Sequence, residues 1–218
     1  MKKIFNYLIC SFIVIFSYCD EKPYAAKDYS YLLNMKGFDQ SLLKTHFTLY
    51  EGYVKNTNLI LSKVKEMEKE NLSRSYEYGA FKRRFGWEFN GMRLHEIYFE
   101  NLGGEGGAPK DLSLVSQINA QYGSFENLKK DLVATGLMRG IGWVLLTRDE
   151  TDGRLIVTWI NEHDVGHLAL GNILLAMDVW EHAYITQFGL KREDYIEAFF
   201  KNVNWNTVEK RYKLSLKK

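Results

Sequence analysis

Cysteine is almost absent from this sequence of 218 residues. Its two cysteines, Cys10 and Cys19, lie near the N-terminus, and no thiol follows them. A body without thiols excludes a disulfide-rich scaffold, a zinc finger, an iron–sulfur cluster and a cysteine nucleophile. Proline is as scarce, with 2 residues, which excludes proline-rich linkers and collagen-like structure. With 46 % hydrophobic and 15 % aromatic residues, the composition is that of a globular protein.

An excess of either charge is also lacking. The formal net charge is +2, and Lys2 and Lys3 at the N-terminus account for all of it. A nucleic-acid binder needs a basic face, so we expect no nucleic-acid partner. The one basic cluster in the body, Lys82-Arg83-Arg84, is interpreted as a solvated helix face.

The N-terminal residues are typical of an export signal. Two lysines precede an apolar run, Ile4–Tyr18, which is short for a membrane span of about 20 residues. The segment Phe16-Ser17-Tyr18-Cys19 resembles the end of a bacterial lipoprotein signal, so residues 1–19 are predicted to be the signal peptide and Cys19 the lipidation site. Cleavage near Ala25-Ala26, or retention as an anchor, are alternatives. The lipoprotein signal and both alternatives predict an exported protein, periplasmic or in the cell envelope. Such a protein would contact a membrane only through this leader or its lipid.

The first half of the body is predicted to be a helical hairpin. Residues 20–38 are expected to be a tether with an extended entry. Residues 39–103 form the N-terminal domain, because apolar side chains recur at spacings of three and four over Gln40–Asn71 and again over about Ser75–Leu102. The glycine cluster that follows is interpreted as a helix end and linker.

The C-terminal domain, residues 110–218, is predicted to be mixed. Two helical runs precede three strand runs, and two further helical runs follow them. The expected helices are Leu112–Tyr122, Phe125–Thr135, Arg192–Asn202 and Thr207–Lys213, and the expected strands are Gly142–Thr147, Leu155–Ile160 and Asn172–Val179. The predicted class is α+β: a long antiparallel helical hairpin followed by a three-stranded antiparallel sheet flanked by helices.

Three of the five histidines can converge with one carboxylate. His46 and His95 lie on the inner faces of the two long helices, and Asp178 ends the third strand. His182 follows four residues later, so a strand-end carboxylate and a histidine in the next turn can reach one point. His167 has no assigned role.

The segment around His182 is more specific. Residues 178–184 read Asp-Val-Trp-Glu-His-Ala-Tyr, which resembles the hallmark of the iron/manganese superoxide dismutase family. Other segments agree in order over about Tyr29–Lys213. They are His46 with Tyr53-Val54-Lys55-Asn56-Thr57-Asn58, His95 before Ile97-Tyr98-Phe99, Gly140-Ile141-Gly142-Trp143, and Asn204-Trp205 with Arg211.

The resemblance implies a metal enzyme. It makes His46, His95, Asp178 and His182 the ligands of one iron or manganese ion per subunit, and three imidazoles with one carboxylate suit either metal. The implied reaction converts superoxide, a small anion, to oxygen and hydrogen peroxide while the metal is alternately reduced and oxidised.

The resemblance also implies two catalytic side chains beside the metal. Tyr53 corresponds to a tyrosine that guards the substrate entrance. His163 stands where many members carry a glutamine that touches metal-bound solvent, and some carry histidine. Gly91, four residues before His95, resembles the manganese arrangement, but histidine at the later position accompanies both metals, so the choice stays open.

Four further residues are expected around the site. Trp143 and Trp180 correspond to its aromatic wall, and Arg211 to a basic residue in the entrance funnel. Glu181 corresponds to a glutamate that pairs with the ligand histidine of the partner subunit, which implies a homodimer.

Two positions depart from the family pattern. Tyr50 and Ile185 replace a histidine and a tyrosine that usually meet across the dimer interface. Their joint absence argues against the usual interfacial proton path. It also keeps two alternatives open: a metal-binding lipoprotein that stores or relays iron or manganese without efficient turnover, and a different oxidase or peroxidase on the same scaffold.

Overall fold

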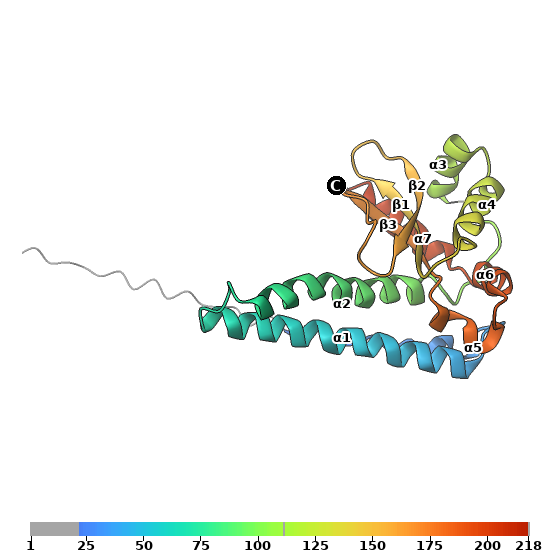
Figure 1. Cartoon of the computed structure of the whole chain (residues 1–218). Coiled ribbons are helices and arrows are strands. Elements are labelled where there is room, and N and C mark those ends of the chain that lie inside the picture. The colour runs from blue at the N-terminus through green and yellow to red at the C-terminus, as the bar shows by residue number, and fades with distance from the viewer. Residues whose placement is uncertain (1–21, 111, 218) are drawn as a thin grey trace, which may run out of the picture.

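The computed structural model describes residues 22–110 and 112–217. Two long helices, α1 (Gln40–Lys69) and α2 (Tyr76–Glu100), run antiparallel side by side. The remaining elements stand over one end of this hairpin (Figure 1). The predicted hairpin is therefore confirmed, with each end within two residues of its expected position.

Local chemistry explains both helices. In α1 the buried side chains recur at helical spacing, and they are Leu42, Leu43, His46, Tyr50, Val54, Thr57 and Ile60. Helix α2 begins after Ser75, whose side chain accepts a hydrogen bond from the Tyr78 amide as an N-cap. The buried face of α2 carries His95 together with Met92, Tyr98 and Phe99. One histidine of each helix thus faces the interior.

The C-terminal part is a small sheet with helices around it, so the predicted α+β class is confirmed. The strands are β1 (Gly142–Asp149), β2 (Leu155–Asn161) and β3 (Gly171–Asp178), all antiparallel in the order β2-β1-β3. The helices are α3 (Ser113–Tyr122), α4 (Phe125–Gly136), α5 (Ile185–Phe188), α6 (Arg192–Lys201) and α7 (Trp205–Ser215). The short helix α5 and two 3-10 helices, η1 (Ser30–Asn34) and η2 (Glu181–Ala183), are additional to the predicted elements.

One hydrophobic core joins the hairpin to the sheet. Tyr98 of α2 stacks on Phe199 of α6 with 5.9 Å between ring centroids. Asn101, just after α2, donates a hydrogen bond from its amide to the Ala176 carbonyl of β3. The C-terminal end of β3 is thereby held against the hairpin, which brings Asp178 to the helix faces that carry the histidines.

A buried carboxylate ties the last helix to α3. Glu209 of α7 accepts hydrogen bonds from the backbone amides of Ser113 and Leu114 and from the Ser113 hydroxyl. It therefore serves as an N-cap supplied from another helix. Burial by itself raises the pKa of Glu209, but these bonds and Lys213 outweigh it and lower the pKa to about 2.

The segment before α1 is not the tether that we predicted. Tyr24 exchanges two hydrogen bonds with Asn58 of α1, and the Lys27 amide donates to the Tyr50 hydroxyl. Tyr29, Leu32 and Phe38 are buried in the core. Apolar side chains therefore hold this segment against the hairpin.

Within residues 22–110 and 112–217, no helix is both long and apolar enough to cross a bilayer. The predicted signal peptide and its lipidation site, Cys19, lie outside the described residues.

Candidate metal centre

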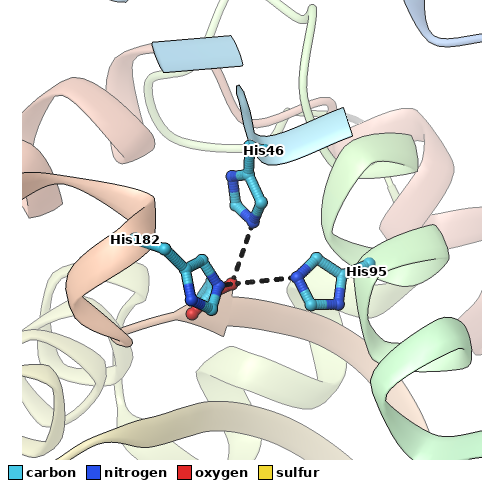
Figure 2. A group of neighbouring side chains, drawn as sticks. His46, His95 and His182 are labelled. Atoms are coloured by element: carbon cyan, nitrogen blue, oxygen red, sulfur yellow. Dashed lines mark hydrogen bonds and ion pairs between the residues drawn. The ribbon is translucent and has the colours of Figure 1, made fainter. Parts of the chain in front are cut away.

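The structure brings the four predicted ligands together. His46 comes from α1, His95 from α2, Asp178 from the last position of β3, and His182 from η2. Figure 2 shows the three histidine rings pointing toward one another from these separate elements. One ligand atom from each of the four residues lies within 4.8 Å of the others.

The distances in this cluster suit a single ion. Nε2 of His46 and Nε2 of His182 lie 3.1 and 3.0 Å from Oδ2 of Asp178, and Nε2 of His95 lies 3.6 Å from the same oxygen. Nitrogen and oxygen ligands lie about 2.0–2.2 Å from a transition metal, so neighbouring ligand atoms are about 3 Å apart. His182 retains 22 % exposure of its side chain, whereas the other three are 0–1 % exposed.

His95 provides the clearest sign that a cation belongs here. Its Nδ1 lies 2.6 Å from the Gly91 carbonyl oxygen, which can only accept, so Nδ1 carries the proton. Nε2 is therefore a bare acceptor, and it is buried without a hydrogen-bond partner in the part of the chain that the structure describes. This lone pair faces the Asp178 carboxylate, and two facing acceptors repel unless a cation lies between them.

Protonation states in the cluster also fit a metal. Burial lowers the pKa of His46 and of His95, which keeps both imidazoles neutral at pH 7. Burial by itself raises the pKa of Asp178, but His182 and His46 outweigh it and hold that pKa well below its usual range. The other carboxylate oxygen, Oδ1, accepts from the Trp180 amide, which orients Oδ2 toward the histidines. Neutral imidazoles and an ionised carboxylate are the forms that bind metal, and this set suits iron or manganese.

Tyr53 and His163 form a hydrogen-bonded pair beside the cluster. The indole of Trp143 donates from Nε1 to His163 Nδ1 at 3.0 Å, so neutral His163 carries its proton on Nε2. That proton is donated to the Tyr53 hydroxyl oxygen at 2.7 Å, and burial lowers the pKa of His163 to about 4, so it is neutral at pH 7. Both ring nitrogens of His163 are therefore engaged by side chains. The O–H of Tyr53, rather than His163 as we expected, is the group left to donate to a bound molecule.

Trp143 and Trp180, which we expected to form an aromatic wall around the metal, both contact His163 of this pair. Trp143 is fully buried, with its ring edge-on to His95 at 5.0 Å between centroids. Trp180 stacks on His163 at 4.9 Å and is partly exposed. Trp87 of α2, which the sequence did not assign to the site, meets both His163 and Trp180 edge-on at 5.2 and 6.1 Å.

Tyr50, which replaces the usual histidine, is fully buried. Its hydroxyl donates to Glu96 at 3.1 Å and accepts from the Lys27 amide. Burial raises the pKa of Tyr50 to about 12. In this chain the position belongs to the packing between the N-terminal segment and the hairpin.

The two charged residues expected around the site differ in setting. Glu181 is exposed and borders a surface hollow of about 850 Å³. The Arg211 side chain is 15 % exposed, and its guanidinium bonds to Glu100, to the Asn101 side chain and to two backbone carbonyls of α2 and β3. These contacts favour a structural role for Arg211 over a place in the entrance funnel.

Two supporting residues were not predicted from the sequence. The Tyr195 hydroxyl donates to the Asp178 carbonyl at 2.6 Å and so holds the end of β3. His167 lies with its Nε2 2.9 Å from the His163 carbonyl oxygen, which supports the loop that carries His163. Trp87 is a third residue that the sequence did not assign to the site. The only feature of the sequence that could have indicated it is its place eight residues before His95, about two helical turns along the same face.

Comparison with known proteins agrees with this geometry. Residues 109–211 match the family model of iron/manganese superoxide dismutases, C-terminal domain. Over 202 residues, 90 % of each chain, the sequence is 32 % identical to the superoxide dismutase [Fe] of Saccharolobus solfataricus. It is 34 % identical to that of Cupriavidus metallidurans over 82 % of this chain and 90 % of the relative, and 31 % identical to that of Aquifex aeolicus over 88 % and 92 %. The chain therefore belongs to the iron/manganese superoxide dismutases.

Proposed function

We propose that this protein converts two superoxide anions and two protons to one oxygen molecule and one hydrogen peroxide molecule. The observation that carries the proposal is the bare Nε2 of His95 facing the Asp178 carboxylate, within a cluster that can hold one metal ion. Family membership favours this activity over storage of a metal, because the relatives above are named superoxide dismutases.

The four clustered residues are proposed to hold iron or manganese. Their imidazoles and single carboxylate are harder than thiolates and offer nitrogen and oxygen alone. When bound, the metal supplies one-electron redox chemistry, taking an electron from one superoxide and giving it to another. The protein keeps the ligands oriented through the Gly91 carbonyl on His95 and the Trp180 amide on Asp178.

Tyr53 and His163 are proposed to serve the substrate. Because His163 donates to the Tyr53 oxygen, the Tyr53 O–H is free to donate a hydrogen bond to a small anion. Burial raises the pKa of Tyr53 well above its usual range, so this proton is retained at neutral pH. The role of Tyr53 is then to orient the anion and that of His163 to orient Tyr53, while the fully buried Trp143 excludes water.

Removal of one ligand tests the metal assignment. His182→Ala leaves three ligands and should lower bound iron or manganese steeply, as measured by elemental analysis after reconstitution with each metal. His167→Ala, which removes a histidine outside the cluster, is the control and should keep its metal. Full metal content in the His182 variant would reject the assignment.

A homodimer is proposed, with Glu181 at its interface. Glu181 is exposed beside ligand His182 and borders the 850 Å³ hollow. Leu137, Met138 and Leu190 line the same hollow with 42 %, 50 % and 93 % exposure. Exposed apolar side chains of this kind favour coverage by a second subunit.

Export as a lipoprotein is proposed from the leader alone. A charged start, a short apolar run and Cys19 at its end support lipidation and a cell-envelope location.

A further inference from the structure

Three partly exposed aromatic side chains border the metal centre. His46, His95 and Asp178 are buried, whereas Tyr53, Trp87 and Trp180 around them are partly exposed. All three rings contact His163, and Trp87 and Trp180 also touch each other. The ligand His182 is also partly exposed, with 22 % of its side chain accessible, so a small anion that approaches from this side meets His182 and these aromatic residues.

Trp87 carries a cation on its ring. The Arg84 guanidinium carbon lies 4.7 Å from the Trp87 ring centroid, and its Nε and Nη2 atoms each lie 2.7 Å from Glu88 Oε1. Stacking on the indole and the bond to Glu88 hold the guanidinium in one place. The basic cluster that we interpreted as a solvated face thus includes one residue fixed beside the site.

The two members of the Arg84–Glu88 ion pair differ in their exposure to solvent. The Arg84 side chain is 53 % exposed and that of Glu88 is 5 % exposed. Among the described residues, the second carboxylate oxygen of Glu88 is buried without a hydrogen-bond partner. The positive end of the pair therefore faces solvent and the negative end lies inside. Burial is the main influence on the pKa of both Tyr53 and His163, and the charge of Arg84 also acts on each.

Three other basic residues, Arg211, Arg192 and Lys82, are engaged elsewhere. Arg211 bonds to Glu100 and to backbone carbonyls. Arg192 donates to the carbonyls of Met138 and Gly140. Lys82 lies over the Tyr78 ring at 5.7 Å, away from Trp87. Of these, Arg84 alone stands on a ring that contacts His163.

We propose that Arg84, held on Trp87 by Glu88, is the positioning residue that attracts the superoxide anion to the entrance of the metal centre. The proposal rests on the proposed function for its substrate. The physical basis is steering, in which a fixed charge beside an opening raises the local concentration of the opposite charge and salt weakens the effect. Arg84 takes no part in electron or proton transfer.

The test compares Arg84→Gln with Arg83→Gln. Both variants lose one positive charge from neighbouring positions of α2, but Arg83 makes no described contact with Trp87. For the Arg84 variant we expect kcat/KM for superoxide to fall about threefold at low ionic strength, with kcat unchanged and the difference lost at about 0.5 M salt. Arg83→Gln should leave kcat/KM near the wild-type value.

A second readout does not depend on turnover. Azide, a small monovalent anion, is titrated into the metal-loaded proteins and its dissociation constant is read from the optical spectrum. The Arg84→Gln variant should bind azide about threefold more weakly at low salt, and Arg84→Lys, which keeps the charge, should restore most of the affinity. The azide titration tests whether Arg84 attracts anions even if the protein has no dismutase activity.

Two outcomes would overturn the proposal. One is an equal loss in the Arg84 and Arg83 variants, and the other is a loss in the Arg84 variant that persists at high salt.

Discussion

Gly91→Ala should destabilise the protein, although alanine in place of a helical glycine normally stabilises. Gly91 lies in the interior of α2, where the exchange alone is worth about 0.5–1 kcal/mol in favour of folding. A Cβ atom at Gly91 would lie 2.6, 2.8 and 2.9 Å from three ring carbons of Tyr53. These separations are well inside van der Waals contact, so the ring or the helix must move.

The expected change in the free energy of unfolding follows from these two opposed effects. Overpacking a filled site costs about 1–3 kcal/mol, so we expect a net loss of about 1–2 kcal/mol in the free energy of unfolding. The Tyr53 ring is stacked on His95 at 5.2 Å, and its hydroxyl is 2.7 Å from His163. Displacement of this ring should break the bond to His163 and lower superoxide turnover with little loss of metal.

The assay is urea unfolding of both Gly91→Ala and a matched control, with turnover measured on the same samples. Gly52→Ala is the control, because Gly52 lies inside α1 and a Cβ atom there would meet no atom within 4 Å outside the backbone of its own helix and its chain neighbours. The control should be more stable than wild type by about 0.5–1 kcal/mol with full turnover. If Gly91→Ala is stabilised as much as the control and turns over normally, the steric reasoning is refuted.

Four further predictions test separate parts of the molecule. His163→Ala should keep most of its metal by elemental analysis but lose most of its superoxide turnover, because Tyr53 loses the partner that orients it; complete loss of metal would make His163 a ligand instead. Glu209→Gln should lower the free energy of unfolding by about 3 kcal/mol at pH 7. This is the stabilisation that corresponds to a Glu209 pKa of about 2 in the folded protein and near 4.5 in the unfolded chain. This stabilisation is fully present above pH 4.5 and is lost as the pH falls toward 2, so the stability of the variant should fall less steeply than that of the wild type over this pH range. Parallel pH profiles for variant and wild type would contradict this. Glu181→Ala should weaken both the dimer and metal retention, as seen by ultracentrifugation and elemental analysis, and a wild-type monomer at micromolar concentration would exclude the interface role. Cys19→Ser should release the protein from the membrane fraction or block its processing, and a wild type already free of membranes would remove the lipidation proposal.

Much of the scaffold was predictable from periodicity. The hairpin and the three strands follow from apolar spacing. The approach of His46, His95, Asp178 and His182 was predictable only because the segment 178–184 carries a recognisable pattern. Their spacing alone, with 132 residues between His46 and Asp178, predicts no contact.

What the sequence did not predict depends on side-chain direction and long-range packing. Three consecutive basic residues look alike in sequence, yet successive helix positions point about 100° apart, so only one of Lys82-Arg83-Arg84 stacks on Trp87. The bond between Tyr53 and His163 joins residues 110 positions apart, and its direction depends on the Trp143 indole that fixes the tautomer. The folding of residues 22–38 onto the hairpin depends on a few contacts, such as Tyr24 with Asn58, that no periodic pattern indicates.

The most direct test of dismutase activity is the decay of superoxide after pulse radiolysis, measured on protein reconstituted separately with iron and with manganese. With one metal ion per chain, at least one of the two forms should remove many superoxide anions per metal ion at a rate first order in superoxide and proportional to protein concentration. A protein that binds one metal per chain but leaves the decay at its spontaneous, second-order rate would contradict the proposed function and favour metal storage.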